Sequence, residues 1–155
     1  MKTVLITGAT SGIGKATAEL LAKSKCRLII CGRNEEVLKQ MKTDLSSSTD
    51  IFSLKFDIRD NSQVENAFNS LPENWKNIDV LINNAGNAHG MDSLENGNVY
   101  DWDAMMDGNV KGILYISKLI IPGMKKQNSG HIVNISSTAA RQTYANGVVY
   151  CASKK

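Results

Sequence analysis

The sequence predicts an α/β fold in which helices cover both faces of one parallel sheet. Short apolar runs alternate strictly with amphipathic segments along all 155 residues. The connections between them are also short, which favours right-handed strand–helix–strand crossovers and a doubly wound sheet. No internal repeat and no second domain is evident, so we expect residues 1–155 to form one domain.

The predicted strands are the apolar runs. The fourth is nearly continuous in apolar residues, as a strand buried on both faces should be. In chain order the predicted strands cover Thr3–Thr7, Arg27–Cys31, Ile51–Phe56, Ile78–Ile82 and His131–Ile135.

The predicted helices carry apolar residues at helical spacing. They cover Ile13–Lys23, Asn34–Leu45, Asn61–Leu71 and a long segment from about Val99 to Lys125, and a last helix begins near Tyr150. A kink is expected before Pro122, because proline removes a helix hydrogen bond. The inner stripe of the long helix is predicted to consist of Trp102, Met105, Met106, Val110, Ile113 and either Ile116 or Ser117.

Composition excludes several classes of function. The net charge is +3 and the basic residues are spread out, which argues against nucleic-acid or membrane-surface partners. No apolar run approaches the roughly 18 residues that span a bilayer. The three cysteines are odd in number and lack metal-type spacing, so we expect no metal site and reduced thiols in a cytoplasmic protein.

A glycine-rich segment, residues 7–14, joins the first predicted strand to the first helix. Glycines there allow a sharp turn and let a pyrophosphate approach the helix N-terminus, where N–H groups and the helix dipole favour anions. The alternative is a tight turn that binds nothing, but its place after the first strand of a βαβ unit favours dinucleotide binding. The expected cofactor contacts are Gly8, Thr10, Ser11, Gly12, Ile13 and Gly14.

The end of the second predicted strand favours NADP over NAD. An NAD site usually places Asp or Glu about 20 residues after the glycines, to bind the ribose 2′-hydroxyl. Arg33 and Asn34 occupy that region here, and a guanidinium suits a 2′-phosphate, although Arg33 could simply be exposed. Asp57 and Ile58, past the third strand, are placed to meet the adenine; alternatively, Asp57 is a capping or turn carboxylate.

Asparagines mark the next part of the predicted site. The segment 83–86 reads Asn-Asn-Ala-Gly and ends the fourth strand, where open α/β sheets bind ligands, although it could be only a turn. Asn109 lies on the predicted apolar stripe of the long helix, where a buried amide needs partners. We expect either a structural hydrogen bond to a neighbouring loop or a water-holding or helix-bending role beside the active site. Gly108 and Gly112 nearby suggest close backbone approach.

Tyr150 and Lys154 are four residues apart, which places both side chains on one face of a helix. An ammonium beside a phenol stabilises the phenolate, so the tyrosine can exchange a proton with an alcohol or ketone near neutral pH. Taken alone, the pair could equally be an exposed Tyr and Lys. Ser137 lies thirteen residues before the tyrosine, where the alternative is a strand-end turn.

These motifs together resemble the short-chain dehydrogenase/reductase family, in order and spacing, over the whole chain. The matching residues are Thr7-Gly8-x-x-x-Gly12-x-Gly14, Asn83-Asn84-Ala85-Gly86, Asn109, Ser137 and Tyr150-x-x-x-Lys154. The resemblance implies a Rossmann-type sheet of strand order 3-2-1-4-5-6-7, assembled as a homodimer or homotetramer. It also implies that Asn84, Ala85, Gly86, Tyr150 and Lys154 bind the cofactor.

Within the family, residues 71–79, 83–91 and 144–147 are similar to NADP-dependent 3-hydroxy acid dehydrogenases of the serine/allo-threonine type. The resemblance implies that Tyr150 exchanges the alcohol proton, that Lys154 supports it and holds the nicotinamide ribose, that Ser137 hydrogen-bonds the substrate oxygen, and that Asn109 holds a water. Two alternatives remain, a reductase of a 3-oxoacyl thioester or ketone and an NADP-binding module without chemistry.

The family pattern continues beyond the lysine of the Tyr-x-x-x-Lys motif. We therefore expect a sheet truncated after the fifth strand and the start of the active-site helix, with Lys154 in a frayed terminal turn. We also expect the 155 residues alone to have little turnover.

Overall fold

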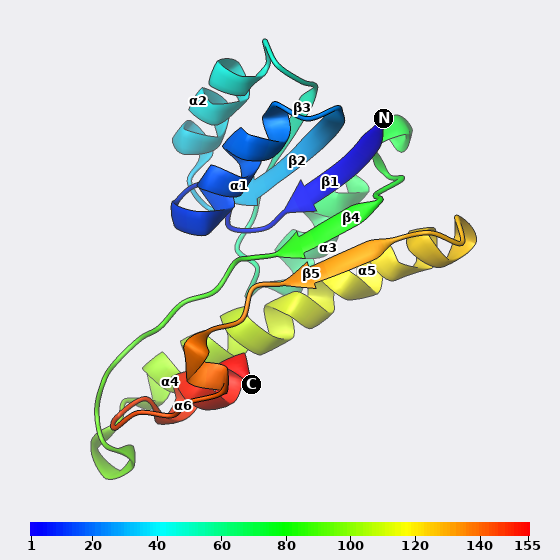
Figure 1. Ribbon diagram of the computed structural model, residues 1–155. Helices are drawn as coiled ribbons and strands as arrows, with labels where there is room; N and C mark the ends of the chain where they lie inside the picture. Colours follow the sequence, from blue (N-terminus) through cyan, green and yellow to red (C-terminus); the bar gives the residue numbers. More distant parts are fainter.

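The computed structural model describes residues 1–155 and contains one five-stranded parallel sheet (Figure 1). Its strand order is β3-β2-β1-β4-β5, and every neighbouring pair is parallel. This order confirms the predicted doubly wound topology for the strands present. The strands are β1 (Lys2–Ile6), β2 (Cys26–Gly32), β3 (Ile51–Lys55), β4 (Val80–Asn83) and β5 (His131–Asn134).

Two helices cover each face of the sheet (Figure 1). On one face lie α1 (Gly12–Ala22) and α2 (Glu35–Leu45); on the other lie α3 (Asn61–Asn69) and α5 (Gly112–Lys126). Helices α4 (Val99–Met106) and α6 (Val148–Lys154) lie together beyond the carboxyl ends of the strands. None of these helices combines the length and apolar character that a membrane crossing requires.

Alternation along β1 divides the core in two. Val4 and Ile6 belong to the apolar cluster beneath α1 and α2, whereas Leu5 belongs to the cluster beneath α3 and α5. Because side chains of a strand point to opposite faces in turn, a strand between two helical layers is apolar at nearly every position. The edge strand β5 is different, since His131 and Ile132 at its start are exposed.

Three single 3-10 turns interrupt the loops, and the sequence analysis did not predict them. They are η1 (Glu73–Trp75), η2 (Leu94–Asn96) and η4 (Thr138–Ala140). The strands and the helices α1, α2, α3 and α6 have the predicted type and differ from prediction only at their ends. The long helix also differs in its interior.

The long helix is irregular before Pro122 is reached, and the kink expected there stays a prediction. Helix α5 continues through Pro122 to Lys126, and the irregularity lies earlier, in the π-helical segment η3 (Asp107–Lys111) between α4 and α5. A π turn accommodates one extra residue and so rotates everything after it. The predicted stripe is partly correct: Met105 and Ile116 are buried, whereas Met106 is 39% exposed. Trp102, Val110 and Ile113 are half-buried. The other buried residues of this stretch are Gly108, Asn109, Gly112, Ile120 and Met124.

Gly112 allows the π segment to lie close to the loop after β3. A Cβ at this position would lie 2.8 Å from Ile58 Cγ1 and 3.1 Å from the Ile58 carbonyl oxygen. The close backbone approach predicted from this glycine is thus confirmed, and it holds the long helix against the edge of the cleft described below.

We expect Gly112→Ala to lower the free energy of unfolding by about 1–2 kcal/mol, because the new methyl group overpacks the contact with Ile58. Gly123→Ala is the matched control in the same helix, since its Cβ would meet only Gln127 Nε2, at 4.0 Å. The control should leave stability unchanged or raise it by up to about 1 kcal/mol through helix propensity. Urea denaturation followed by circular dichroism measures both; equal stability of the two variants would contradict the close packing.

Candidate functional site

A cleft of about 450 Å³ opens at the carboxyl ends of the strands. Its size suits a nucleotide or other small ligand. Most of the sequence-predicted cofactor residues line it: Gly8, Thr10, Ser11, Gly12, Ile13, Arg33, Asp57, Ile58, Asn84, Ala85, Gly86, Tyr150 and Lys154. Gly14, Asn34, Asn109 and Ser137 do not line it, and their positions are explained below.

The glycine-rich loop forms one side of the cleft. Gly8 and Gly12 have positive φ angles of 63° and 50°, which side chains rarely adopt. A Cβ at Gly8 would lie 2.8 Å from Ala85 Cα, and one at Gly14 would collide with the Gly8 carbonyl and the Asn84 amide. Gly14 therefore allows helix α1 to pack closely against the loop at Gly8 and Asn84, and its contact with the cofactor stays a prediction.

Helix α1 begins at the cleft without a side-chain cap. Ser11 is its N-cap residue but makes no capping hydrogen bond, whereas Asn34, Asp60 and Asn98 each cap their helix. The first-turn N–H groups of a helix need partners, and they favour anions. An oxygen-rich anionic group in the cleft would meet this requirement.

Thr7 and Asn84 join the two loops that form the cleft floor. Thr7 Oγ1 accepts hydrogen bonds from Asn84 N (3.1 Å) and Ala85 N (3.0 Å). The Asn84 side-chain amide donates in return to the carbonyls of Thr7 and Gly8, both at 3.0 Å. Thr7 is fully buried, so these bonds are made away from water and hold the loops in one arrangement.

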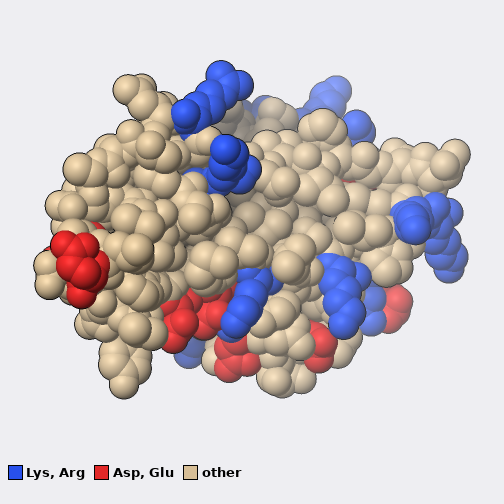
Figure 2. Space-filling view, turned by 90° about the horizontal axis from the view of Figure 1, so that it is seen from below, with Lys and Arg blue, Asp and Glu red and all other residues tan.

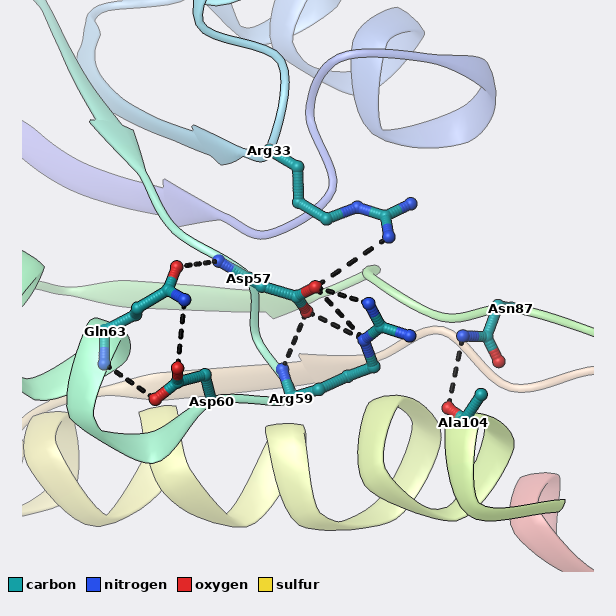
Figure 3. A network of polar contacts seen from close by, with 7 residues as sticks. All are labelled: Arg33, Asp57, Arg59, Asp60, Gln63, Asn87 and Ala104. Carbon is teal, nitrogen blue, oxygen red and sulfur yellow. Dashed lines mark hydrogen bonds and ion pairs between the residues drawn. The ribbon is translucent and has the colours of Figure 1, made fainter. Parts of the chain in front are cut away.

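One wall of the cleft is charged (Figure 3). It consists of Arg33, which follows β2, and of Asp57 and Arg59, which follow β3. Arg59 contacts the Asp57 carboxylate through Nε (3.0 and 3.1 Å) and Nη2 (2.6 Å). The Arg59 hydrogen bonds, more than any other cause, hold the pKa of the Asp57 carboxyl below its usual range. Arg33 Nη1 lies 3.9 Å from Asp57 Oδ2, and its side chain is 70% exposed.

Sequence reasoning missed Arg59, although the Asp-x-Arg spacing 57–59 was visible. The alternative interpretation of Asp57 as a turn carboxylate is partly correct, because its Oδ1 also accepts from Arg59 N at 3.0 Å. The side-chain oxygen of Asn34 accepts from Val37 N and caps α2, and its contact with the cofactor stays a prediction. It lines a shallower groove next to the cleft, beside Arg33 and Lys55.

Asn109 lies beneath the cleft and is 2% exposed. Its Oδ1 accepts from Asn87 N at 2.8 Å, and its Nδ2 donates to the Asn87 carbonyl at 2.8 Å and to Ser153 Oγ at 2.9 Å. These bonds match the first sequence expectation, a structural link to a neighbouring loop. Asn109 also lies in the π segment, so the helix departs from α geometry at the predicted residue. A water-holding role stays a prediction.

Helix α6 brings Tyr150 and Lys154 to the cleft wall opposite the glycine-rich loop. Lys154 Nζ donates to the Ile135 carbonyl at 3.1 Å, and the Lys154 carbonyl accepts from Ser136 Oγ at 2.7 Å. The expected fraying of Lys154 is therefore wrong, because hydrogen bonds at both its side chain and its backbone tie it to the end of β5.

Ser137 is near this wall but does not line the cleft. Its Oγ accepts from Ala139 N at 3.2 Å and caps η4, which packs on α6. The neighbouring Ser136 lines the cleft instead. The position agrees with the strand-end turn that was the alternative for Ser137, and contact with a substrate stays a prediction.

The match to a family model covers residues 2–155 and is described as short chain dehydrogenase. The chain belongs to this family. It is 40% identical over 151 residues to the NADP-dependent 3-hydroxy acid dehydrogenase of Escherichia coli O6:H1, covering 97% of this chain and 60% of that protein. The chain thus spans about three fifths of the length of this curated relative.

Solved structures show the same fold. The closed form of serine dehydrogenase complexed with NADP+ has a TM-score of 0.91 and 41% identity, over 98% of this chain and 60% of that one. NAD+-bound xylitol dehydrogenase has a TM-score of 0.92 and 28% identity, over 99% of this chain and 59% of that one. Because structures with either dinucleotide superpose equally well, the fold by itself does not select between them.

We expect Asn109→Ala to lower the free energy of unfolding by about 2–4 kcal/mol, because it leaves the Asn87 N–H and carbonyl and the Ser153 hydroxyl without their partner. Asn66→Ala is the control, since Asn66 is an exposed helical residue and should give a change within about 0.5 kcal/mol. Thermal and urea unfolding of the variants test this. An Asn109→Ala protein as stable as the control would show that the buried amide does not join these segments.

Proposed function

We propose that this protein transfers hydride between NADP and a small 3-hydroxy acid such as serine or allo-threonine. The observation that carries the proposal is the position of Tyr150 and Lys154 on one wall of a cleft whose opposite side is a glycine-rich loop. The names of the relatives, a 3-hydroxy acid dehydrogenase and a serine dehydrogenase, support the choice of substrate class.

The cleft residues fit a dinucleotide. Gly8 and Gly12 turn the loop with positive φ angles and have no side chains, so a pyrophosphate can approach the uncapped start of α1. NADP, when bound, supplies the hydride acceptor or donor. Gly8, Thr10, Ser11, Gly12 and Ile13 would hold its phosphates, and Asn84, Ala85 and Gly86 would form the floor between the phosphates and the Tyr150 wall.

Arg33 supports NADP over NAD. It stands at the cleft where an acidic residue would bind a ribose 2′-hydroxyl, and its guanidinium is mostly exposed. A guanidinium binds a phosphate dianion with charge-assisted hydrogen bonds. The carboxylate nearby, that of Asp57, is already engaged by Arg59.

Tyr150, Lys154 and Ser137 are proposed to handle the proton and the substrate oxygen. The Tyr150 oxygen takes the proton of the substrate alcohol in oxidation and returns it in reduction. Lys154, held by the Ile135 carbonyl, provides the positive charge that stabilises the phenolate. Ser137 would donate a hydrogen bond to the substrate oxygen as charge develops there, while its own oxygen continues to accept from Ala139 N.

We also propose that the protein assembles as a homodimer or homotetramer. The long helix exposes Met106 (39%), Leu114 (61%) and Ile121 (37%). If this face is covered by a second copy, Leu114→Glu should shift the mass measured by light scattering toward the monomer. Lys42→Glu, at an exposed position of α2 on the other face of the sheet, should not change the mass.

The functional proposal is tested with Tyr150→Phe in the full-length protein, because these 155 residues by themselves are expected to have little turnover. The substitution removes only the hydroxyl. We expect at least about a hundredfold loss of NADP-dependent oxidation of L-serine or L-allo-threonine, while the affinity for NADPH, measured by fluorescence titration, stays within about threefold. Tyr100→Phe is the control because Tyr100 is 83% exposed, and it should leave both measurements unchanged.

Full turnover by Tyr150→Phe, or no binding of NADPH by the unmodified protein, would refute the proposal. Activity confined to a 3-oxoacyl thioester or a simple ketone would refute the substrate class alone. The low turnover expected of these 155 residues by themselves stays a prediction, and the same assay tests it.

A further inference from the structure

Asp57 stands between two arginines in the charged wall of the cleft (Figure 3). Arg59 holds its carboxylate with three side-chain contacts of 2.6–3.1 Å, and the Arg59 backbone N–H adds a fourth at 3.0 Å. Arg33 has a single contact with the same carboxylate, at 3.9 Å. This distance is too long for a hydrogen bond, so the two arginines share Asp57 very unequally.

The surrounding turn holds Asp57 in this position. Its backbone N–H donates to Gln63 Oε1 at 3.1 Å, and Gln63 is itself held by Asp60, which accepts from Gln63 N at 3.1 Å and from Gln63 Nε2 at 2.9 Å. These bonds hold the Asp57 backbone, and from this position its carboxylate lies 2.6 Å from Arg59 Nη2 and 3.9 Å from Arg33 Nη1. Both guanidinium groups are therefore close to the same carboxylate.

The long helix leaves room for Arg59 and adds to its favourable charge environment. A Cβ at Gly108, in the π segment, would lie 3.8 Å from Arg59 Cγ and 3.2 Å from Asn87 Nδ2. The nearby Asp107 carboxylate and, more strongly, the Asp57 hydrogen bond raise the pKa of the Arg59 guanidinium. Arg59 is thus held against Asp57 by the helix on one side and by the turn after β3 on the other.

We propose that Arg59 is a positioning residue for cofactor choice: by engaging the Asp57 carboxylate, it keeps Arg33 free to bind a 2′-phosphate. This inference rests on the proposed function, in which Arg33 meets that phosphate. Without Arg59, Asp57 would pair with Arg33, and its negative charge would face the phosphate directly. A dinucleotide that lacks the 2′-phosphate does not need Arg33 and would be affected much less.

The test is the ratio of the affinities for NADPH and NADH, measured by fluorescence titration of the whole chain. Arg59→Met removes the charge and keeps most of the side-chain length. We expect it to weaken NADPH binding by about tenfold or more and NADH binding by less than about threefold. Arg59→Lys keeps the charge without the two-pronged geometry and should give a smaller fall in the ratio.

Two double variants separate this role from a structural one. Asp57→Asn combined with Arg59→Met should restore the ratio, because the competing carboxylate is gone. In an Arg33→Ala background, Arg59→Met should not change the ratio further, because the Arg33 guanidinium that Arg59 keeps free is absent. Any contact of Asp57 with the adenine would alter both affinities together and would leave the ratio unchanged.

An equal loss of both affinities in Arg59→Met, or no recovery with Asp57→Asn, would show that Arg59 only supports the fold and would overturn the inference. If Arg59→Met does not fold, the two affinities are measured for Arg59→Lys instead, and an equal loss of both overturns the inference in the same way. The proposed function fails in a different way, through an unmodified protein that binds neither nucleotide or prefers NADH.

Discussion

The hydrogen bonds between Thr7 and Asn84 are the constraint on which the rest of the site depends. They connect the carboxyl ends of β1 and β4, the two neighbouring strands at the centre of the sheet. The glycine-rich loop begins on one side of this link, and the segment containing Gly86 begins on the other. If the two loops moved independently, neither the uncapped start of α1 nor the floor of the cleft would have a defined position.

A second link runs from this floor to the helices beyond the sheet. Asn109 binds both backbone groups of Asn87 and the Ser153 hydroxyl, so one amide connects the π segment, the loop after β4 and α6. A Cβ at Gly86 would lie 2.9 Å from Asn109 Oδ1 and 3.1 Å from Lys154 Nζ. The cleft wall that carries Tyr150 and Lys154 is therefore joined to the floor through buried polar groups, whose hydrogen bonds are costly to break because water cannot replace them.

The charged side chains of this protein act through a few close contacts and not through one large charged surface. Lys and Arg side chains are dispersed among Asp and Glu over the face shown in Figure 2 and form no single patch there. The arrangement of Asp57 with Arg33 and Arg59 shows how a few charges can still matter, because all three stand in one cleft wall and the central carboxylate of Asp57 is only 22% exposed. Ion pairs such as Glu35 with Lys39 are exposed and contribute little by comparison.

The sequence by itself determined the strand and helix order, the glycine-rich loop and the Tyr150–Lys154 pair, because these depend on local periodicity and on spacing along the chain. Only the tertiary structure decided the position of the π segment, the packing role of Gly14, the cap formed by Ser137 and the pairing of Arg59 with Asp57. Each of these depends on atoms that are brought together from separate elements or on competition between two partners for one group. Neither leaves a periodic signal in the sequence.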